Sequence, residues 1–213
     1  MYERVSKREC RISSERAQRL MKDVQIELSD KYRFEFILVG SGNWGTMVKD
    51  EDGHYDLDYQ IRLTHNSPVI GNNGFRNSTQ VNKDFFEALR KHKKGKETFE
   101  DSTTAITLTN KDEKPYHIDF VIIDNTRYPP LIIRRNMKKG SPADEKTWNE
   151  LPKMHWAFDY FKSLHHDYKK YIIEEMVIPA KQKEKAKKEG NSTKRSSTEI
   201  FVNEVNRFAQ KYS

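Results

Sequence analysis

The sequence of 213 residues is long enough for one large domain or two small ones, and 35% hydrophobic residues allow a packed core. Charged residues make up 33% of the chain and the formal net charge is +7, which favours an anionic partner. Cys10 is the only cysteine, which excludes an intrachain disulfide, and the lack of an apolar leader or bilayer-length segment leads us to expect a cytoplasmic protein without membrane contact.

Hydrophobic periodicity predicts a mixed α/β part at the start of the chain. Apolar residues at helical spacing predict a helix over residues 13–30, with Ser13 or Ser14 as its N-cap. Later stretches carry strand or helix patterns, and the expected elements are strands at 33–40, 54–63, 103–110 and 116–123, a helix at 79–92, and a short edge strand within 129–135.

After about residue 140 the pattern becomes helical, with apolar spacing from Met154 to Ile172 and again from Phe201 to Tyr212. We therefore expect an α+β core over residues 1–140 and a helical lobe over 141–213. A Lys-rich segment at 181–195 holds seven Lys/Arg and two Glu. Two interpretations stay open for it: a solvated helix end and loop, or a weak contact with nucleic acid.

Carboxylates in apolar strand contexts are the strongest chemical signal. Asp56 and Asp58 are two residues apart, so in a strand they project from the same face. Asp119 lies in a second apolar strand, and if the two strands are neighbours the three aspartates converge. Carboxylates this close repel one another unless a cation neutralises them, and oxygen ligands favour Mg²⁺ or Mn²⁺. The pattern predicts a two-metal site for phosphoryl chemistry.

A glycine-rich turn precedes these aspartates. In the sequence GSGNWGT, starting at Gly40, small residues allow the backbone to turn tightly after a strand. The exposed backbone N–H groups and the Ser41 hydroxyl can then bind phosphate oxygens. Trp44 in the same turn either stacks on a base or anchors the loop. The acidic run from Asp50 to Asp52 is interpreted as a solvated turn, because it lacks the spacing of a calcium loop.

With Gly40-Ser41, Asp56-Leu57-Asp58 and Asp119 in this order, the chain resembles the nucleotidyltransferase superfamily of the DNA polymerase β type. Within it, the chain looks most like the bacterial relatives of cyclic GMP-AMP synthase and oligoadenylate synthase. The resemblance implies a nucleotidyltransferase fold, with a mixed sheet flanked by helices and followed by a small helical lobe.

The resemblance also implies roles for individual residues. Gly40, Ser41 and the turn amides would bind the phosphates of a nucleoside triphosphate, while Asp56, Asp58 and Asp119 would hold the metal ions. Asp119 would also help an acceptor hydroxyl to lose its proton. Lys169 is the lysine of the helical lobe expected to reach the triphosphate, the alternative being a solvated helix face.

The implied activity is transfer of a nucleoside monophosphate from a nucleoside triphosphate to a hydroxyl acceptor, with release of pyrophosphate. The product would be a nucleotide second messenger of antiviral defence, or a modified RNA end, protein or aminoglycoside. The alternative is a binding module without turnover, a sensor or antitoxin-like protein that contacts nucleic acid or a protein partner.

Overall fold

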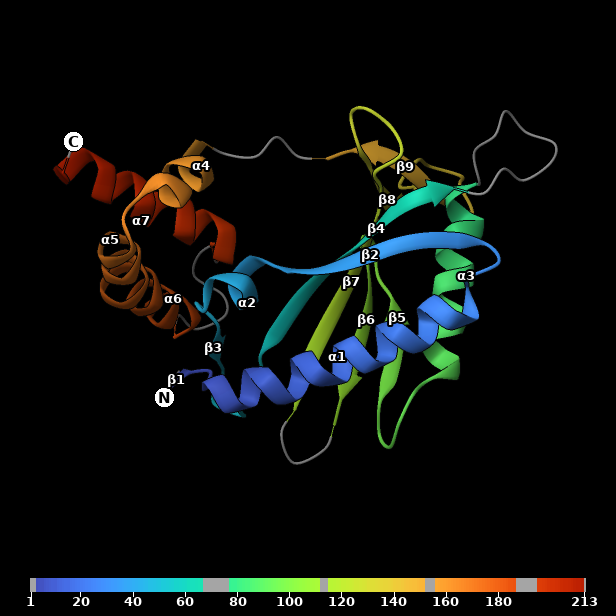
Figure 1. The fold of residues 1–213 in the computed structure, drawn as a ribbon, viewed down its shortest axis with the longest axis horizontal. Helices are drawn as coiled ribbons and strands as arrows, with labels where there is room; N and C mark the ends of the chain where they lie inside the picture. The colour runs from blue at the N-terminus through green and yellow to red at the C-terminus, as the bar shows by residue number, and fades with distance from the viewer. Residues whose placement is uncertain (1–2, 67–76, 112–114, 152–155, 187–194, 213) are drawn as a thin grey trace.

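The computed structural model describes residues 3–66, 77–111, 115–151, 156–186 and 195–212. Within these ranges a mixed sheet carries α1 (Lys7–Glu27) and α3 (Ser78–Lys91), and the helices that follow residue 155 gather at one end of the sheet (Figure 1). The expected α+β class is confirmed. No helix of the described ranges has the length and apolar character needed to cross a membrane.

The large sheet has seven strands, in the order β2-β4-β7-β6-β5, with β8 pairing with β7 and with β9. These strands are β2 (Tyr32–Val39), β4 (Asp56–Asn66), β5 (Thr98–Asp101), β6 (Ala105–Asn110), β7 (Tyr116–Asp124), β8 (Leu131–Arg135) and β9 (Lys146–Glu150). The β4–β7 pair is parallel and the other pairs are antiparallel. A small separate pair joins β1 (Glu3–Arg4) to β3 (Val48–Lys49).

The two faces of the sheet differ in burial because side chains alternate along each strand. On β4 the buried positions are Leu57, Tyr59, Ile61 and Leu63, which join α1 and α3 in the main hydrophobic core. The alternate positions of β4, which include Asp58, are less buried and polar. The helices therefore cover one face, and the aspartates lie on the other.

The prediction for the first helix was wrong at its start. α1 begins at Lys7, where Ser6 and Glu9 form a reciprocal capping box. Ser13 lies inside the helix, where its hydroxyl donates to the backbone carbonyls of Glu9 and Cys10. Apolar spacing locates the buried stripe of a helix, whereas the cap is set by a local Ser-x-x-Glu motif that precedes this stripe.

The sheet extends beyond the region expected to contain it. β8 is not an edge strand, because β9 pairs with its other side, and β9 lies after residue 140. Lys146 of β9 is buried, and its ammonium group donates to Asp101 Oδ1 at 2.6 Å and to the carbonyl of Ser102 at 2.8 Å. This strand carries few apolar residues, and long-range contacts of this kind hold it in place.

The helical lobe consists of α4 (Trp156–Ser163), α5 (His166–Tyr171), η1 (Ile172–Val177), α6 (Ile178–Lys185) and α7 (Ser197–Tyr212). η1 is a π-helical turn that leads directly into α6. Pro179 stands at the start of α6, where its missing N–H and its ring are incompatible with regular α-helical bonding to the preceding turn. The wider turn accommodates the proline without ending the helix. Met154, part of the expected helical pattern, lies outside the described residues.

Candidate active site

The pairing of β4 with β7 places the aspartates side by side. In this parallel pair Asp58 is opposite Asp119, and Asp56 is opposite His117. Residues opposite each other in a pair share a face, so all three aspartates lie on the face of the sheet that α1 and α3 leave uncovered. The convergence expected from the sequence therefore follows from the register of two neighbouring strands.

Burial and mutual repulsion make two of these carboxylates difficult to ionise. Burial, followed by the charges of Asp119 and Asp56, raises the pKa of Asp58 to about 6. Burial also raises the pKa of Asp119, and a hydrogen bond from Thr107 opposes this change. Asp56 is more exposed, and its Oδ1 lies 3.4 Å from Nδ1 of His117.

This donor set fits a hard divalent cation. It offers only carboxylate oxygens, and a bound cation would offset the burial and repulsion that disfavour the charged forms. Among the described residues, the three aspartates are not a group whose ligand atoms all lie within 4.8 Å of one another. Two-ion sites place their ions about 3.5–4 Å apart and divide their ligands between them.

The glycine-rich turn lies close beside Asp58. β2 pairs with β4 so that Val39 is opposite Asp58, and Gly40 comes next in the chain. Gly40 has a φ angle of +59°, and a Cβ atom at this residue would stand 2.6 Å from Asp58 Oδ2. The short helix α2 (Gly40–Trp44) begins at this glycine. Only glycine combines this backbone conformation with this close approach.

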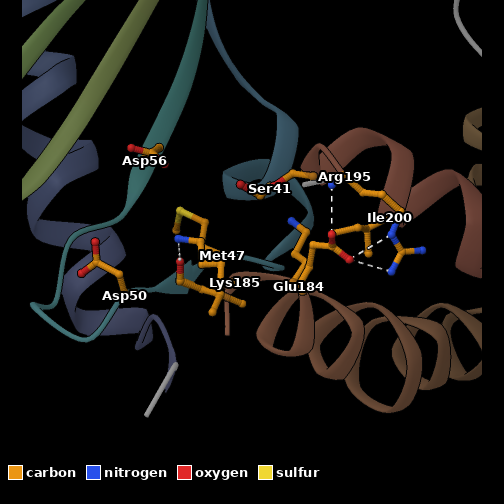
Figure 2. A pocket seen from close by; sticks show the side chains of 11 residues that line it. Ser41, Met47, Asp50, Asp56, Glu184, Lys185, Arg195 and Ile200 are labelled. Carbon is orange, nitrogen blue, oxygen red and sulfur yellow. Dashed lines mark hydrogen bonds and ion pairs between the residues drawn. The ribbon is translucent and has the colours of Figure 1, made fainter. Parts of the chain in front are cut away.

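A cavity of about 370 Å³ opens between the turn, the start of β4 and the helical lobe (Figure 2). The residues that line it are Ser41, Met47, Val48, Asp50, Asp56, Lys181, Glu184, Lys185, Arg195, Ser197 and Ile200. Ser41 and Asp56 bring the turn and the first aspartate to the cavity. Lys181 and Lys185 bring positive charge from the opposite wall, so the cavity joins cation-binding and anion-binding groups.

The two lysines reach the cavity from α6. Lys181 is 5% exposed, and its Nζ donates to the carbonyl of Thr46 at 3.1 Å and to its hydroxyl at 3.2 Å. Lys185 donates to the carbonyl of Val48 at 2.9 Å. Burial lowers the pKa of Lys181 to about 8, and the nearby charge of Asp58 opposes this effect. The lysines thus connect α6 to the segment that follows the glycine-rich turn.

An ion pair between the buried Glu184 of α6 and the exposed Arg195 connects two parts of the Lys-rich segment. Glu184, which is 3% exposed, accepts hydrogen bonds from the backbone N–H and the Nε of Arg195, each at 3.0 Å. The Arg195 guanidinium is thereby engaged at the cavity wall. Ser197 follows at the first turn of α7, whose N-terminus is closed by a capping interaction between Ser196 and Glu199.

The interpretation of residues 181–195 as a solvated segment was wrong for its first part. Lys181 and Lys185 are directed inward, whereas Lys183 between them is exposed. Residues 187–194 lie outside the described ranges, and the expected nucleic-acid contact has no structural support. The sequence signal that marks the inward lysines is their spacing with Glu184, since positions i, i+3 and i+4 share one helix face.

Two other expectations concern Lys169 and Trp44. Lys169 donates to the carbonyl of Lys162 and is not among the described residues that line the cavity. The structure therefore brings Gly40, Ser41 and the aspartates together without Lys169. Trp44 packs against Phe161 and Phe201, with ring centroids 5.3 and 6.0 Å away. Of the two roles considered for Trp44, anchoring the loop is the one the structure shows.

The acidic turn between β3 and β4 brings potential ligand atoms of Asp50, Asp52 and His54 within 4.8 Å of one another. Asp50 Oδ1, however, accepts hydrogen bonds from the backbone N–H groups of Asp52 and His54. Such hydrogen bonds are typical of an aspartate side chain that stabilises the turn in which it lies. They agree with the solvated turn expected from the sequence.

Comparison with known proteins gives matches in structure only. No family model and no curated protein matches the sequence. The CdnE c-di-GMP synthase of Capnocytophaga granulosa, described as STING-associated, has a TM-score of 0.65 and 19% identity, over 98% of this chain and 62% of its own. Vibrio cholerae DncV in its GTP-bound form has a TM-score of 0.57 and 16% identity, over 95% and 53%.

A third solved structure is the CD-NTase CdnG of Bradyrhizobium diazoefficiens in complex with GTP, with a TM-score of 0.53 and 17% identity. It is matched over 75% of this chain and 43% of its own. The chain thus spans between 43% and 62% of the length of these three proteins. The expected resemblance is confirmed at the level of the fold: the chain has the nucleotidyltransferase fold of these bacterial proteins.

Proposed function

We propose that this chain is a divalent-cation-dependent nucleotidyltransferase that transfers a nucleoside monophosphate from a nucleoside triphosphate to a hydroxyl acceptor. One observation carries the proposal. Of the three aspartates, Asp56 lines the cavity, together with Ser41 from the glycine-rich turn and with Lys181 and Lys185 from α6. A triphosphate needs both features, cation-binding oxygens near the reacting phosphorus and positive groups for its remaining charge.

In this assignment the turn and the helical lobe bind the donor. The Ser41 hydroxyl and the backbone N–H groups of α2 donate to phosphate oxygens. Lys181 and Lys185 supply positive charge to the β- and γ-phosphates, and the leaving pyrophosphate keeps this contact as its charge increases. Because Glu184 already engages Arg195, we assign the triphosphate to the two lysines, which donate hydrogen bonds to the uncharged oxygens of Thr46 and Val48.

Asp56, Asp58 and Asp119 would hold Mg²⁺ or Mn²⁺, which when bound supplies charge neutralisation at the reacting phosphate and favours ionisation of the acceptor hydroxyl. In this assignment Asp119 would hold the cation nearest the acceptor hydroxyl through Oδ2, because Oδ1 accepts a hydrogen bond from Thr107, and the hydroxyl proton would pass to solvent water. The acceptor oxygen forms a bond to the α-phosphorus as the bond from this phosphorus to the bridging oxygen breaks. Pyrophosphate leaves on the side of α6.

The similar structures support a nucleotide as the acceptor. One of them is named as a c-di-GMP synthase, and two others contain GTP. We therefore infer that the hydroxyl acceptor is itself a nucleotide and that the product is a nucleotide second messenger. We also propose that the protein acts in the cytoplasm and takes part in antiviral defence.

The test is turnover of each nucleoside triphosphate, labelled at the α-phosphate, with Mg²⁺ or Mn²⁺ and separation of the products. The wild-type protein should release pyrophosphate and form a labelled nucleotide product. Asp58→Asn keeps the side-chain shape but removes the charge, and should reduce turnover to background while the fold is retained. Asp52→Asn, in the exposed acidic turn, is the matched control and should remain active.

Two results would contradict the proposal. Turnover near the wild-type rate in Asp58→Asn would exclude a reaction that depends on this carboxylate. Nucleotide binding by the wild-type protein without any turnover, with either cation and with nucleotide, RNA and protein acceptors present, would favour the alternative of a binding module.

A further inference from the structure

Thr107 lies beside Asp119 on the face of the sheet that carries the aspartates. β6 and β7 are antiparallel, and Thr107 is the residue directly opposite Asp119. The Thr107 hydroxyl donates a hydrogen bond of 2.6 Å to Asp119 Oδ1. Since β7 lies between β4 and β6, this bond reaches Asp119 from the side away from Asp58. It holds one carboxylate oxygen and leaves the other available.

The hydroxyl serves a carboxylate that is partly removed from water. Asp119 has intermediate exposure in β7. A carboxylate removed from water needs a hydrogen-bond donor in exchange. A positively charged donor at this position would repel a divalent cation, whereas a hydroxyl supplies the hydrogen bond without adding charge. The Thr107 hydroxyl therefore holds Oδ1 of this carboxylate without adding charge beside the aspartates.

We propose that Thr107 is a positioning residue for metal binding: its hydroxyl fixes the Asp119 carboxylate through Oδ1 so that Oδ2 is left to bind a divalent cation. The inference rests on the proposed function, and it adds a residue that lies outside the glycine-serine and aspartate motif. Thr107 does not touch the nucleotide in this assignment. It acts through Asp119.

The chain offers a matched control on the same strand. Thr109 is two residues after Thr107, so it lies on the same face of β6, but it is opposite His117 rather than an aspartate. Removal of a hydrogen bond that orients a metal ligand typically lowers metal affinity or activity about 10- to 100-fold. The same substitution at Thr109, to valine, tests whether losing any hydroxyl from this face of the sheet weakens metal binding.

The experiment compares Thr107→Val, Thr107→Ser and Thr109→Val by Mn²⁺ binding without nucleotide, followed by electron paramagnetic resonance of the free ion. Thr107→Val should weaken Mn²⁺ binding about 10- to 100-fold, while Thr107→Ser and Thr109→Val stay within about threefold of wild type. The Mg²⁺ concentration for half-maximal turnover should rise in Thr107→Val and stay close to the wild-type value in Thr107→Ser and Thr109→Val. Circular dichroism and melting temperature establish that each variant is folded, and Thr107→Ala replaces the valine variant if that variant does not fold.

The outcomes separate this inference from the proposed function. If wild type binds Mn²⁺ through Asp58, as shown by loss of binding in Asp58→Asn, and Thr107→Val binds it equally well, the role of Thr107 is wrong and the metal site stands. If Thr109→Val weakens binding as much as Thr107→Val, the effect is general to the face and the inference is also wrong. If wild type does not bind Mn²⁺, the metal site and the role of Thr107 are both overturned.

Discussion

Asp58 leaves no space for a side chain at Gly40: a Cβ atom on residue 40 would stand 2.6 Å from Asp58 Oδ2. The turn proposed to bind phosphate and the strand that carries the aspartates are therefore fitted to each other without space for a side chain. Real Cβ atoms do not approach an oxygen this closely, so any larger residue at position 40 must displace the Asp58 carboxylate or the turn.

Gly40→Ala should lower kcat/KM for the nucleoside triphosphate at least tenfold, because the new methyl group displaces Asp58. The positive φ angle should also reduce the free energy of unfolding by about 1–2 kcal/mol. Gly53→Ala is the control, since Gly53 has a φ angle of +85° and open space around the position of a Cβ. This variant should lose similar stability and keep its activity. Equal activity losses in the two variants would show that backbone strain, rather than contact with Asp58, is responsible.

The raised pKa of Asp58 predicts how stability depends on pH without metal. The pKa rises from 3.8 to about 6 on folding, so between these values the folded state binds more protons than the unfolded state. The contribution of Asp58 to the free energy of unfolding is therefore present at about pH 4 and is lost as pH rises through about 6. Asp58→Asn lacks this loss and should melt above wild type at pH 7 in EDTA, by about 2–4 °C for each kcal/mol of repulsion removed.

Thermal melts across pH 4–7 in EDTA, and again with Mg²⁺, provide the measurement. Mg²⁺ should raise the melting temperature of wild type at pH 7 and leave Asp58→Asn nearly unchanged, because a ligand stabilises only the state that binds it. A gap between the two proteins that stays constant over the whole pH range would contradict the raised pKa.

Local periodicity predicted only part of the arrangement of the aspartates. The i, i+2 spacing of Asp56 and Asp58 determines that they share a face of a strand, and the apolar context of Asp119 marks it as part of another strand. The parallel register that puts Asp58 opposite Asp119 is a long-range property, which the sequence indicates only through the family resemblance. The geometry of the aspartates therefore depends on both local and long-range information.

The roles of Lys181 and Lys185 could not be predicted from charge alone. A run of lysines usually indicates a solvated surface, and the burial of Lys181 depends on Thr46, which is 135 residues earlier in the chain. The strand at Lys146 was missed for a similar reason, since its contacts with Asp101 lie 45 residues away. In both cases a long polar side chain is buried because a distant segment supplies its hydrogen-bond partners.

The buried pair of Arg16 and Glu97 should contribute far more to stability than an exposed pair. Arg16 Nε and Nη2 donate to the two Glu97 carboxylate oxygens at 2.6 and 2.7 Å, and both side chains are less than 10% exposed. Glu97→Ala leaves a buried guanidinium without its partner, which typically costs about 3–5 kcal/mol. Lys91→Ala breaks the exposed pair with Glu27 and should change the free energy of unfolding far less, because water screens that pair. Urea unfolding measures both, and similar losses would contradict this difference.

Lys181→Met should weaken binding of the nucleoside triphosphate while Lys183→Met does not, although both residues belong to α6. Lys181 is buried at the cavity and Lys183 is exposed. A hydrogen bond to a charged group contributes about 1.5–3 kcal/mol, so kcat/KM should fall about 10- to 150-fold in Lys181→Met. Steady-state kinetics provides the measurement, and melting temperatures establish that both variants are folded.

The pH dependence of KM gives the same prediction a second test. The pKa of Lys181 is lowered to about 8, so the free protein loses this positive charge as pH rises through about 8. Triphosphate binding needs the charged form, and KM of wild type should therefore increase above about pH 8. Lys183→Met should keep this increase and Lys181→Met should lose it. An unchanged increase in Lys181→Met would assign the titration to another group and remove Lys181 from the phosphate site.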